Sequence, residues 1–186
     1  NALLARSLGE KKRSKASKVA GNGLFLGILI YFVCVLFGLF GTGGYIGTQT
    51  EDPEVFKGAV SYIRICCLLS VGQVYFGLFE KLLQSTGRSV LSTIGQIIGA
   101  LINIVFDPLF IYGIGPFPEM GIDGAAYATV LGQIISAILL MVLHRRYNRE
   151  YDQGLSYMKP DGKVIKDIYS LGVPAILAQA LNAVMV

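Results

Sequence analysis

Apolar runs long enough to cross a lipid bilayer constrain this chain more than any other feature of its sequence. A transmembrane helix needs about 20 consecutive, mostly apolar residues. Runs of this kind lie at about 19–40, 59–79, 90–113, 122–143 and 164–186. Because a backbone inside lipid must satisfy its own hydrogen bonds, each run is expected to form a helix. The sequence therefore predicts an all-α fold, a polytopic transmembrane helical bundle.

Composition and motifs exclude several other classes of protein. Hydrophobic residues make up 53% of the chain and charged residues only 15%, whereas a soluble domain carries about 25% charged residues. The sequence has no Walker loop, no Gly-rich nucleotide loop after a strand and no nucleophile beside a His. We therefore expect a membrane protein that is not an enzyme.

The positive charges fall on alternate connections between the apolar runs. Of the 16 Lys and Arg, only Lys57 and Arg64 lie elsewhere. The other basic residues are Arg6, Lys11, Lys12, Arg13, Lys15, Lys18, Lys81, Arg88, Arg145, Arg146, Arg149, Lys159, Lys163 and Lys166. Cytoplasmic loops are enriched in Lys and Arg, so these connections are predicted to be cytoplasmic. Topology explains the basic clusters, and no nucleic-acid partner is expected.

The connection at 145–163 is the longest and suggests how the chain is divided. It is polar and is bracketed by Pro160 and Gly162, which is typical of a join between two groups of helices. We expect 1–144 to form one group, 145–163 to be a cytoplasmic linker and 164–186 to be the first helix of a second group. Since Asn1 is not Met and Val186 ends inside an apolar run, the chain is expected to be an internal piece of a longer protein.

Asp107 is the polar residue that the apolar runs explain least. It lies about 17 residues into its run, roughly 26 Å from the cytoplasmic side, where a carboxylate costs about 3 kcal/mol to insert. Asn103 lies one helical turn earlier on the same face. Pro108 removes a backbone donor, frees the carbonyl of Ile104 and favours a kink. We predict that Asp107, Asn103 and Pro108 belong to a functional site, with Thr129 lining a cavity. The alternative is that Asp107 marks the helix end near the lipid headgroups.

Other residues are expected to have structural roles. Glu80 and Lys81 stand at the inner boundary of the second run and are predicted to be solvated. His144 is predicted to stand at a cytoplasmic helix end among arginines. Small residues four positions apart let helices approach closely, and they recur in two similar segments, as Gly95 and Gly99 and as Gly132 and Ser136, with a further pair at Gly23 and Gly27.

Several segments resemble the multidrug and toxic compound extrusion (MATE) family. The stretch NIVFDPLFIY at 103–112 and the stretch MGIDGAAYATV at 120–130 are similar to its fifth-to-sixth helix region. The stretch ARSLGEK at 5–11 resembles its loop between helices two and three, and LLQSTGR at 82–88 its loop between helices four and five. Gly172, Val173 and Pro174 resemble the opening of helix seven.

This resemblance implies a twelve-helix transporter made of two six-helix lobes. The chain would run from the end of helix two to the start of helix seven, so that 1–144 belongs to the N-terminal lobe and 164–186 to the C-terminal lobe. Asn103 and Asp107 would belong to a cluster that couples transport to a cation, with Thr129 as a further member. That cluster could hold Na⁺ at Asp107 and Asn103. No other metal or cofactor is expected beyond H⁺ or Na⁺ as the coupling ion.

The function that the resemblance implies is secondary active antiport. Cationic or amphipathic drugs or toxic compounds would leave the cell in exchange for protons or sodium ions, by alternating access. A lipid-linked oligosaccharide flippase of related architecture and a non-transport scaffold or channel are the alternatives. The expected partners are small-molecule substrates and the lipid bilayer, with a monomeric full-length protein in a bacterial cytoplasmic membrane. The sequence names neither the substrate nor the coupling ion.

Overall fold

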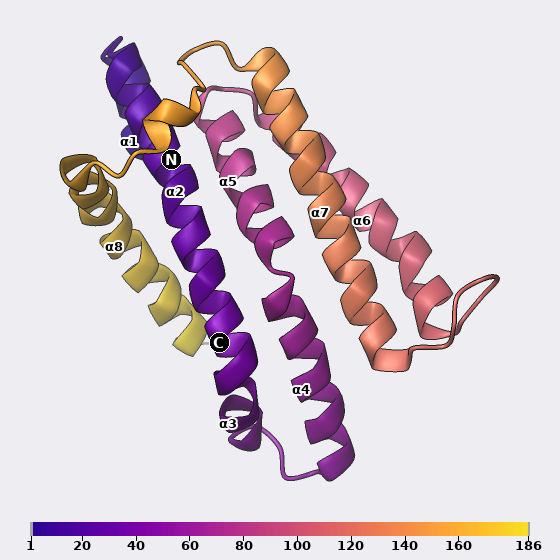
Figure 1. The fold of residues 1–186 in the computed structure, drawn as a ribbon. Helices are drawn as coiled ribbons and strands as arrows, with labels where there is room; N and C mark the ends of the chain where they lie inside the picture. Colours follow the sequence, from indigo (N-terminus) through magenta and orange to yellow (C-terminus); the bar gives the residue numbers. More distant parts are fainter. Residues whose placement is uncertain (1, 186) are drawn as a thin grey trace.

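The computed structural model describes residues 2–185 and is 82% helical, with no strand in that range. Asn1 and Val186, where the chain is expected to be truncated, lie outside the described residues. The helices are α1 (Ala2–Gly9), α2 (Arg13–Leu36), α3 (Thr42–Gly47), α4 (Pro53–Leu68), α5 (Val71–Ser85), α6 (Ser89–Ile111), α7 (Gly121–Tyr147) and α8 (Gly162–Met185), with a π-helical turn at Phe37–Gly41 and a 3₁₀ turn at Leu155–Met158. Figure 1 shows these helices side by side as a bundle, which confirms the predicted fold class.

The lengths and apolar surfaces of the helices agree with a membrane environment. Four helical stretches in the described residues are long and apolar enough to cross a bilayer, and α4 with α5 makes a fifth if the bent pair counts as one span. Large apolar side chains remain exposed on their outer faces, including Phe40 on the π-helical turn and Ile104 on α6. A soluble bundle would bury such side chains, whereas a membrane bundle presents them to lipid or to further helices.

The first span is longer than the sequence indicates. Helical structure runs from Arg13 to Gly47, although the predicted run ends at about residue 40. The backbone ladder shifts to π-type bonding at Phe37–Gly41 and then continues as α3. Thr42, which is fully buried, donates its hydroxyl to the carbonyl oxygen of Gly38, so its side chain contributes to the helical continuation.

The second span is bent. Helices α4 and α5 meet at an angle of 55°, at the break that Leu69 and Ser70 make inside the predicted run 59–79. The start of α4 follows helix-capping rules, because the carboxylate of Asp52 accepts hydrogen bonds from the backbone N–H groups of Glu54 and Val55 and Pro53 occupies the first turn. At the other end of the bundle, α5 and α6 are joined by a turn at residues 86–88.

Helices α6 and α7 pack closely because small residues face each other. A methyl group added at Gly99 would lie 2.6 Å from the hydroxyl of Ser136, and one added at Gly132 would lie 3.1 Å from the carbonyl oxygen of Gly99. Gly95 contacts Leu140 in the same way. The predicted small-residue faces are therefore confirmed for this pair. Gly27 contacts Leu78. A methyl group added at Gly23 would have no atom within 4 Å, so the prediction of a close helix contact at Gly23 is wrong.

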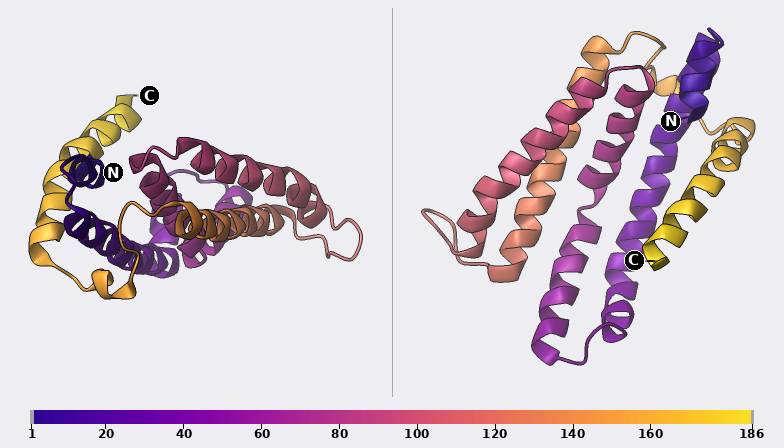
Figure 2. Two further views of the ribbon diagram at one scale, coloured as in Figure 1. Left: turned by 90° about the horizontal axis from the view of Figure 1, so that it is seen from above. Right: turned by 180° about the vertical axis from the view of Figure 1, so that it is seen from behind.

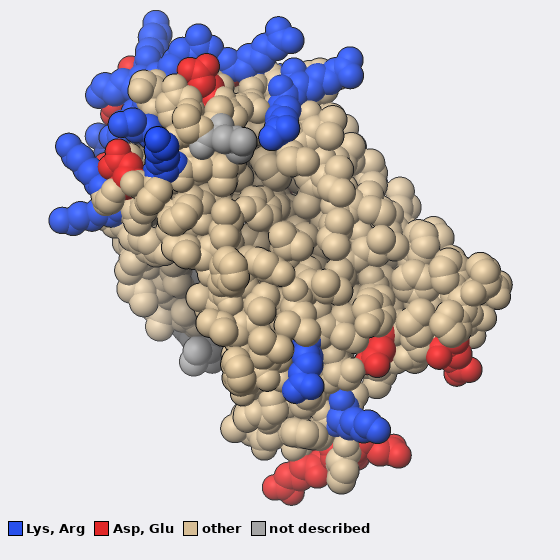
Figure 3. All heavy atoms as spheres, viewed as in Figure 1, with Lys and Arg blue, Asp and Glu red and all other residues tan. Residues whose placement is uncertain are grey.

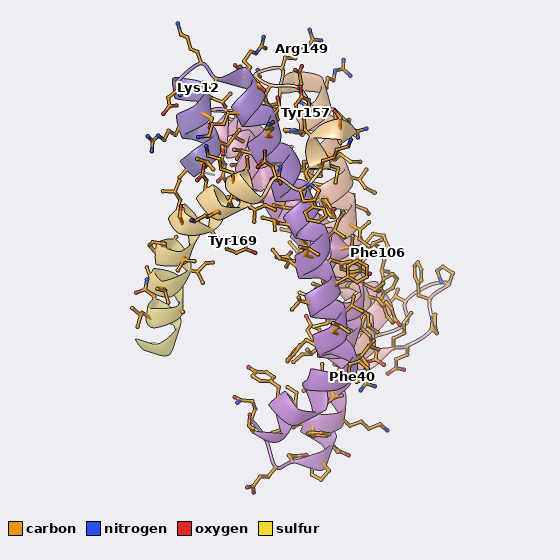
Figure 4. The ribbon with its side chains drawn as sticks, turned by 60° about the vertical axis from the view of Figure 1, so that its left-hand side comes forward. Lys12, Phe40, Phe106, Arg149, Tyr157 and Tyr169 are labelled. Atoms are coloured by element: carbon orange, nitrogen blue, oxygen red, sulfur yellow. The ribbon has the colours of Figure 1, made fainter. Side chains whose placement is uncertain are left out.

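Residues 148–161, which we call the strap, lie across the end of the bundle between α7 and α8. Figure 2 shows that α8 lies beside α2, away from α6 and α7, so the strap crosses from one side of the bundle to the other. In Figure 4, Tyr157 lies beside α2, at the same end as Lys12 and Arg149. The division of the chain into 1–144, 145–163 and 164–186 stays a prediction, but its middle segment is packed against helices.

Several hydrogen bonds hold the strap on α2. The guanidinium of Arg13 donates to the backbone carbonyl oxygens of Arg149 and Glu150 at 2.7 and 3.0 Å. The hydroxyl of Ser17 accepts from the backbone N–H of Asp152 at 2.9 Å. At the end of the strap, the carboxylate of Asp161 accepts hydrogen bonds from the backbone N–H groups of Val164 and Lys163. These bonds, together with the nearby Lys18, hold the pKa of the Asp161 carboxyl below its ordinary value.

Charge separates the two ends of the molecule. Figure 3 shows the Lys and Arg side chains gathered at the end that holds α1 and the strap, while acidic side chains and few basic ones occupy the opposite end. Basic connections that alternate along the sequence therefore meet at one end of the bundle, as the topology inferred from loop charge requires.

Candidate functional site

A polar pocket of about 330 Å³ lies between α5, α6 and α7. Its lining residues are Phe76, Gln96, Gly99, Ala100, Asn103, Thr129, Gly132, Gln133 and Ser136. The polar members carry amide or hydroxyl groups and none carries a formal charge. Gln96 and Ala100 are exposed, so the pocket opens on the surface of the described bundle.

The helical repeat explains why these residues meet. On α6, Gln96, Gly99 and Asn103 follow each other at intervals of three and four residues, which places them on one face. On α7, Thr129, Gly132 and Ser136 do the same. The glycines bring the two backbones close, and a methyl group at Gly132 would lie 2.8 Å from the amide oxygen of Asn103. The two polar faces are thus turned toward each other.

Three polar oxygens in this region are buried without a hydrogen-bond partner among residues 2–185. They are the amide oxygen of Asn103, the hydroxyl of Ser136 and one carboxylate oxygen, Oδ1, of Asp107. Leaving a buried acceptor unpaired costs about 1–3 kcal/mol. Native proteins rarely leave such groups unpaired, so these three oxygens mark positions on α6 and α7 where water, an ion or a ligand would bind.

The predicted site residues are brought together only in part. Asn103 and Thr129, from α6 and α7, line the same pocket. Asp107 lies one turn beyond Asn103 on α6 and is not among the lining residues, and Pro108 follows it inside the helix. Asn103 and Thr129 therefore line one pocket, and Asp107 and Pro108 lie one turn farther along α6, outside its lining. Their functional roles stay predictions.

A metal site of the usual kind is not formed. Within residues 2–185 there is no group of three or more His, Cys, Asp or Glu side chains placed to hold a metal ion. The suggested Na⁺ position has two side-chain donors, Asp107 and Asn103. Sodium binding there stays a prediction.

Glu80 is a residue that the sequence analysis misjudged. The side chain was expected to be solvated, but the residue is only 9% exposed. Its carboxylate oxygen Oε1 accepts from Nε2 of Gln84 at 2.7 Å and from Nε2 of Gln96 at 2.8 Å, and Nζ of Lys81 lies 3.4 Å away. Gln84 one turn later, on the same face, was the available sequence signal, because a Gln at that spacing can hydrogen-bond to a carboxylate.

His144 lies in the last turn of α7 with Arg145 and Arg146, as predicted, but its side chain is buried, with 3% exposure. Its ring nitrogens lie 3.2 Å from Nδ2 of Asn148 and 3.3 Å from the hydroxyl oxygen of Tyr151. The ring also packs against Phe79 of α5. Its neighbours Arg145 and Arg146 face outward, because successive helical residues point in different directions. Burial raises the pKa of the Tyr151 hydroxyl, which belongs to the strap.

Known relatives resemble nearly the whole chain. "Multidrug export protein MepA" of Staphylococcus saprophyticus is 23% identical over 181 residues, which are 97% of this chain and 39% of that protein. "Probable multidrug resistance protein YoeA" of Bacillus subtilis is 28% identical over 182 residues, 96% of this chain and 39% of that protein. The chain thus spans about two fifths of the length of these relatives. These relatives are transport proteins and not enzymes, which agrees with the prediction from the sequence.

Solved structures share the fold. A structure titled "Inward-facing conformation of a multidrug resistance MATE family transporter of the MOP superfamily" matches with a TM-score of 0.86 and 24% identity, covering 96% of this chain and 40% of that one. A MOP superfamily transporter from Pyrococcus furiosus, whose title reports a binding pocket of reversed polarity, matches with a TM-score of 0.83 and 25% identity, over 96% of this chain and 39% of that one.

The family follows from the sequence itself. The sequence model of the MatE family matches residues 1–109, more than half of the chain. The helices, the multi-pass arrangement and the relatives all agree with that match. The chain therefore belongs to the MatE family, as the resemblance in its sequence indicated.

Proposed function

We propose that this chain is part of a secondary active antiporter that exports cationic or amphipathic compounds in exchange for protons or sodium ions. The observation that carries the proposal is the pocket shared by Asn103 and Thr129, with the unpaired carboxylate oxygen of Asp107 one turn away. The relatives are named as multidrug export and resistance proteins, which supports the same class of substrate.

The coupling step would take place at Asp107. A carboxylate inside a membrane bundle is costly unless it is protonated or paired with a cation, so it has reason to bind H⁺ or Na⁺. Asn103 would contribute its amide oxygen and Thr129 its hydroxyl to the same ion or to water around it. Pro108 leaves the carbonyl of Ile104 without its usual helical donor, and α6 could bend there as the ion binds. The two lobes would then rock between inward-facing and outward-facing states.

The composition of the pocket favours this proposal over a lipid-linked oligosaccharide flippase. A flippase that carries anionic phosphate-linked lipids would need Lys or Arg in the pocket, and the described lining holds neither. Uncharged amide and hydroxyl groups beside a carboxylate suit cationic or amphipathic molecules. A non-transport scaffold or channel gives no reason for an unpaired carboxylate inside the bundle.

The proposal also covers the coupling ion, the oligomeric state, the membrane and the division of the chain. The coupling ion would be the only cofactor, and the full-length transporter would be a monomer in a bacterial cytoplasmic membrane. Residues 1–144 would form part of the N-terminal lobe, 145–163 the cytoplasmic linker and 164–186 the start of the C-terminal lobe.

The test is dye efflux from vesicles that contain the full-length transporter carrying this segment. Under an imposed pH or sodium gradient, wild type should move a fluorescent cationic dye, and Asp107→Asn should reduce this movement to the level of protein-free vesicles. Asp123→Asn is the matched control, because it is the same change at the same end of the α6–α7 pair. Asp123 accepts a hydrogen bond from Ser61 there, which Asn can still accept.

The outcomes separate the hypotheses. Loss of driven efflux in Asp107→Asn, with Asp123→Asn active, supports coupling through Asp107. Full efflux in Asp107→Asn contradicts the coupling role. Absence of dye movement in wild type under either gradient contradicts drug antiport and favours the flippase.

A further inference from the structure

A continuous polar face of α6 connects the coupling region to Glu80. Asp107, Asn103 and Gln96 lie four and seven residues apart, which places them on one side of the helix. The pocket extends along this side from Asn103 to Gln96. Beyond Gln96, the next polar group is the carboxylate of Glu80, which accepts the Gln96 amide N–H at 2.8 Å. From Asp107 to Gln96 the face covers roughly 16 Å of helix.

The pocket wall along this face is suited to hold water. The amide oxygen of Asn103 and the hydroxyl of Ser136 are buried and lack partners among the described residues, and Ser136 is only 1% exposed. A pocket of about 330 Å³ has room for several water molecules, each of which occupies about 30 Å³ in the liquid. Ordered water normally bridges such unpaired groups.

Glu80 stands where this polar face reaches the basic end of the bundle. It lies on α5 next to Lys81, whose ammonium group is largely exposed. The side chains of Gln84, Gln96 and Lys81 all donate to the same carboxylate oxygen of Glu80, Oε1. A proton on the other oxygen, Oε2, therefore leaves these hydrogen bonds intact. A carboxylate in this position can accept a proton from the pocket and release it to water on the side of the basic loops.

We propose that Glu80 is the second proton-carrying carboxylate of the transporter, through which the proton taken up at Asp107 leaves on the side of the basic loops. This inference rests on the proposed function in its proton-coupled form. The protonated Asp107, one turn beyond the pocket, gives its proton to water beside Asn103. The proton passes through water in the pocket, and the Glu80 carboxylate accepts it there. Glu80 then gives the proton to bulk water, so that both carboxylates return to their charged form and no other reactant is needed.

The groups around Glu80 agree with a charged resting state. On its own helix, Lys81 supplies a positive charge 3.4 Å from Oε1. From α6, the neighbours Gln96 and Ser92 are uncharged, and Ser92 contacts Gln84. From α7, the titratable His144 packs on Phe79, the residue before Glu80. From α2, Leu24 is the neighbour in the apolar cluster around Phe79.

The test compares Glu80→Gln with wild type in the reconstituted full-length transporter. Gln keeps the size of the side chain and an oxygen that accepts from Gln84 and Gln96, but it carries no proton. We measure dye efflux driven by a pH gradient while the pH on the side of the basic loops is varied, together with equilibrium binding of the dye. Glu150→Gln is the matched control, because it is the same change at an exposed carboxylate of the strap.

The expected result is a selective loss of proton-driven transport. Since a positioned proton acceptor contributes about 10²-fold or more, Glu80→Gln should slow efflux at least about tenfold and remove its dependence on pH at the basic side. Dye binding should stay within about twofold, because the hydrogen-bonded network is kept. Glu80→Asp, which restores a titratable group, should recover the pH dependence.

Some outcomes would contradict the role of Glu80 and leave the proposed antiport function intact. One outcome would contradict both. Wild-type efflux and pH dependence in Glu80→Gln, with Asp107→Asn inactive, removes Glu80 from the route and keeps coupling at Asp107. Efflux driven by sodium alone has the same consequence. If Glu80→Gln loses dye binding together with transport and Glu80→Asp does not restore the pH dependence, Glu80 is structural only. Full activity in Asp107→Asn contradicts both proposals.

Discussion

At the scale of single residues, the polar groups of this bundle are concentrated where glycines let two helices approach. Gly99 and Gly132 leave room for the Ser136 hydroxyl and the Asn103 amide between α6 and α7. Larger residues at these positions would separate the helices and fill the pocket. The size and shape of the pocket therefore depend on these glycines as much as on the amide and hydroxyl side chains that line it.

Gly132→Ala tests this dependence. The added methyl group would lie 2.8 Å from the Asn103 amide oxygen, closer than real contacts allow, and 3.1 Å from the Gly99 carbonyl oxygen, tighter than most real contacts. Overpacking of this kind costs about 1–3 kcal/mol. We expect the purified full-length transporter to lose several degrees of thermal stability and part of its dye affinity. Gly77→Ala on α5, where an added methyl group meets no atom within 4 Å, should leave both unchanged. Equal effects of the two substitutions would show that helix propensity, and not packing at Gly132, sets the result.

Asn103 and Thr129 line the same pocket, as the family resemblance implied for two members of one cluster, while their functional roles stay predictions. The surroundings of the site were harder to predict. Glu80 and His144 could not be placed, since their burial depends on which helices pack against α5 and on where the strap lies. Gln84 is a local signal for Glu80, but Gln96 on α6 and the ring contact of Phe79 with His144 join different helices. Contacts between different helices leave no periodic signal in the sequence.

At the scale of helices and connections, the strap is the element that differs most from expectation. The polar composition of residues 145–163 predicts a linker. A polar segment can nevertheless pack against the bundle when its backbone forms hydrogen bonds with the helices. Tyr151 is buried against His144, and Arg13 and Ser17 of α2 bind its backbone. The strap thereby ties the end of α7 to the start of α2.

The helix ends show a similar limit of sequence reasoning. The start of α4 was predictable because Pro53 carries a local signal. The bend between α4 and α5 was not, because Leu69 and Ser70 are neither Pro nor Gly and the run reads as continuously apolar. In the same way, the extension of the first span to Gly47 depends on π-type bonding around residues 37–41, which composition does not reveal.

Gly21→Ala should loosen the strap. A methyl group at Gly21 would overlap the backbone carbonyl of Tyr157, and a backbone group cannot move aside as a flexible side chain can. We expect faster trypsin cleavage after Arg149 in the folded full-length transporter, because docked segments resist proteolysis. Gly23→Ala, two residues along the same helix with nothing within 4 Å of the added methyl group, is the control. Cleavage at the wild-type rate in Gly21→Ala would mean that the strap is not held against α2.

At the scale of the whole molecule, one end of the bundle carries the basic connections, the strap and Glu80, and the other carries the loops with few positive charges. Asp107 lies near the C-terminal end of α6, toward the second end, and the pocket runs from Asn103 toward the first. The arrangement gives the proposed transport cycle a direction, with ion entry near Asp107 and ion release near Glu80. That direction holds only if the basic end faces the cytoplasm.

Single-cysteine labelling of the full-length transporter tests this orientation. With every cysteine of the full-length protein, Cys34, Cys66 and Cys67 included, replaced by Ala, we expect Glu150→Cys in the strap to react with a membrane-impermeant maleimide only after the cells are permeabilised, because positively charged loops stay in the cytoplasm. Gln49→Cys, in the exposed connection before α4, should react in intact cells. The cysteine-free protein controls for background labelling. Labelling of Glu150→Cys in intact cells would reverse the bundle in the membrane, and the proposed proton route from Asp107 to Glu80 would then point out of the cell.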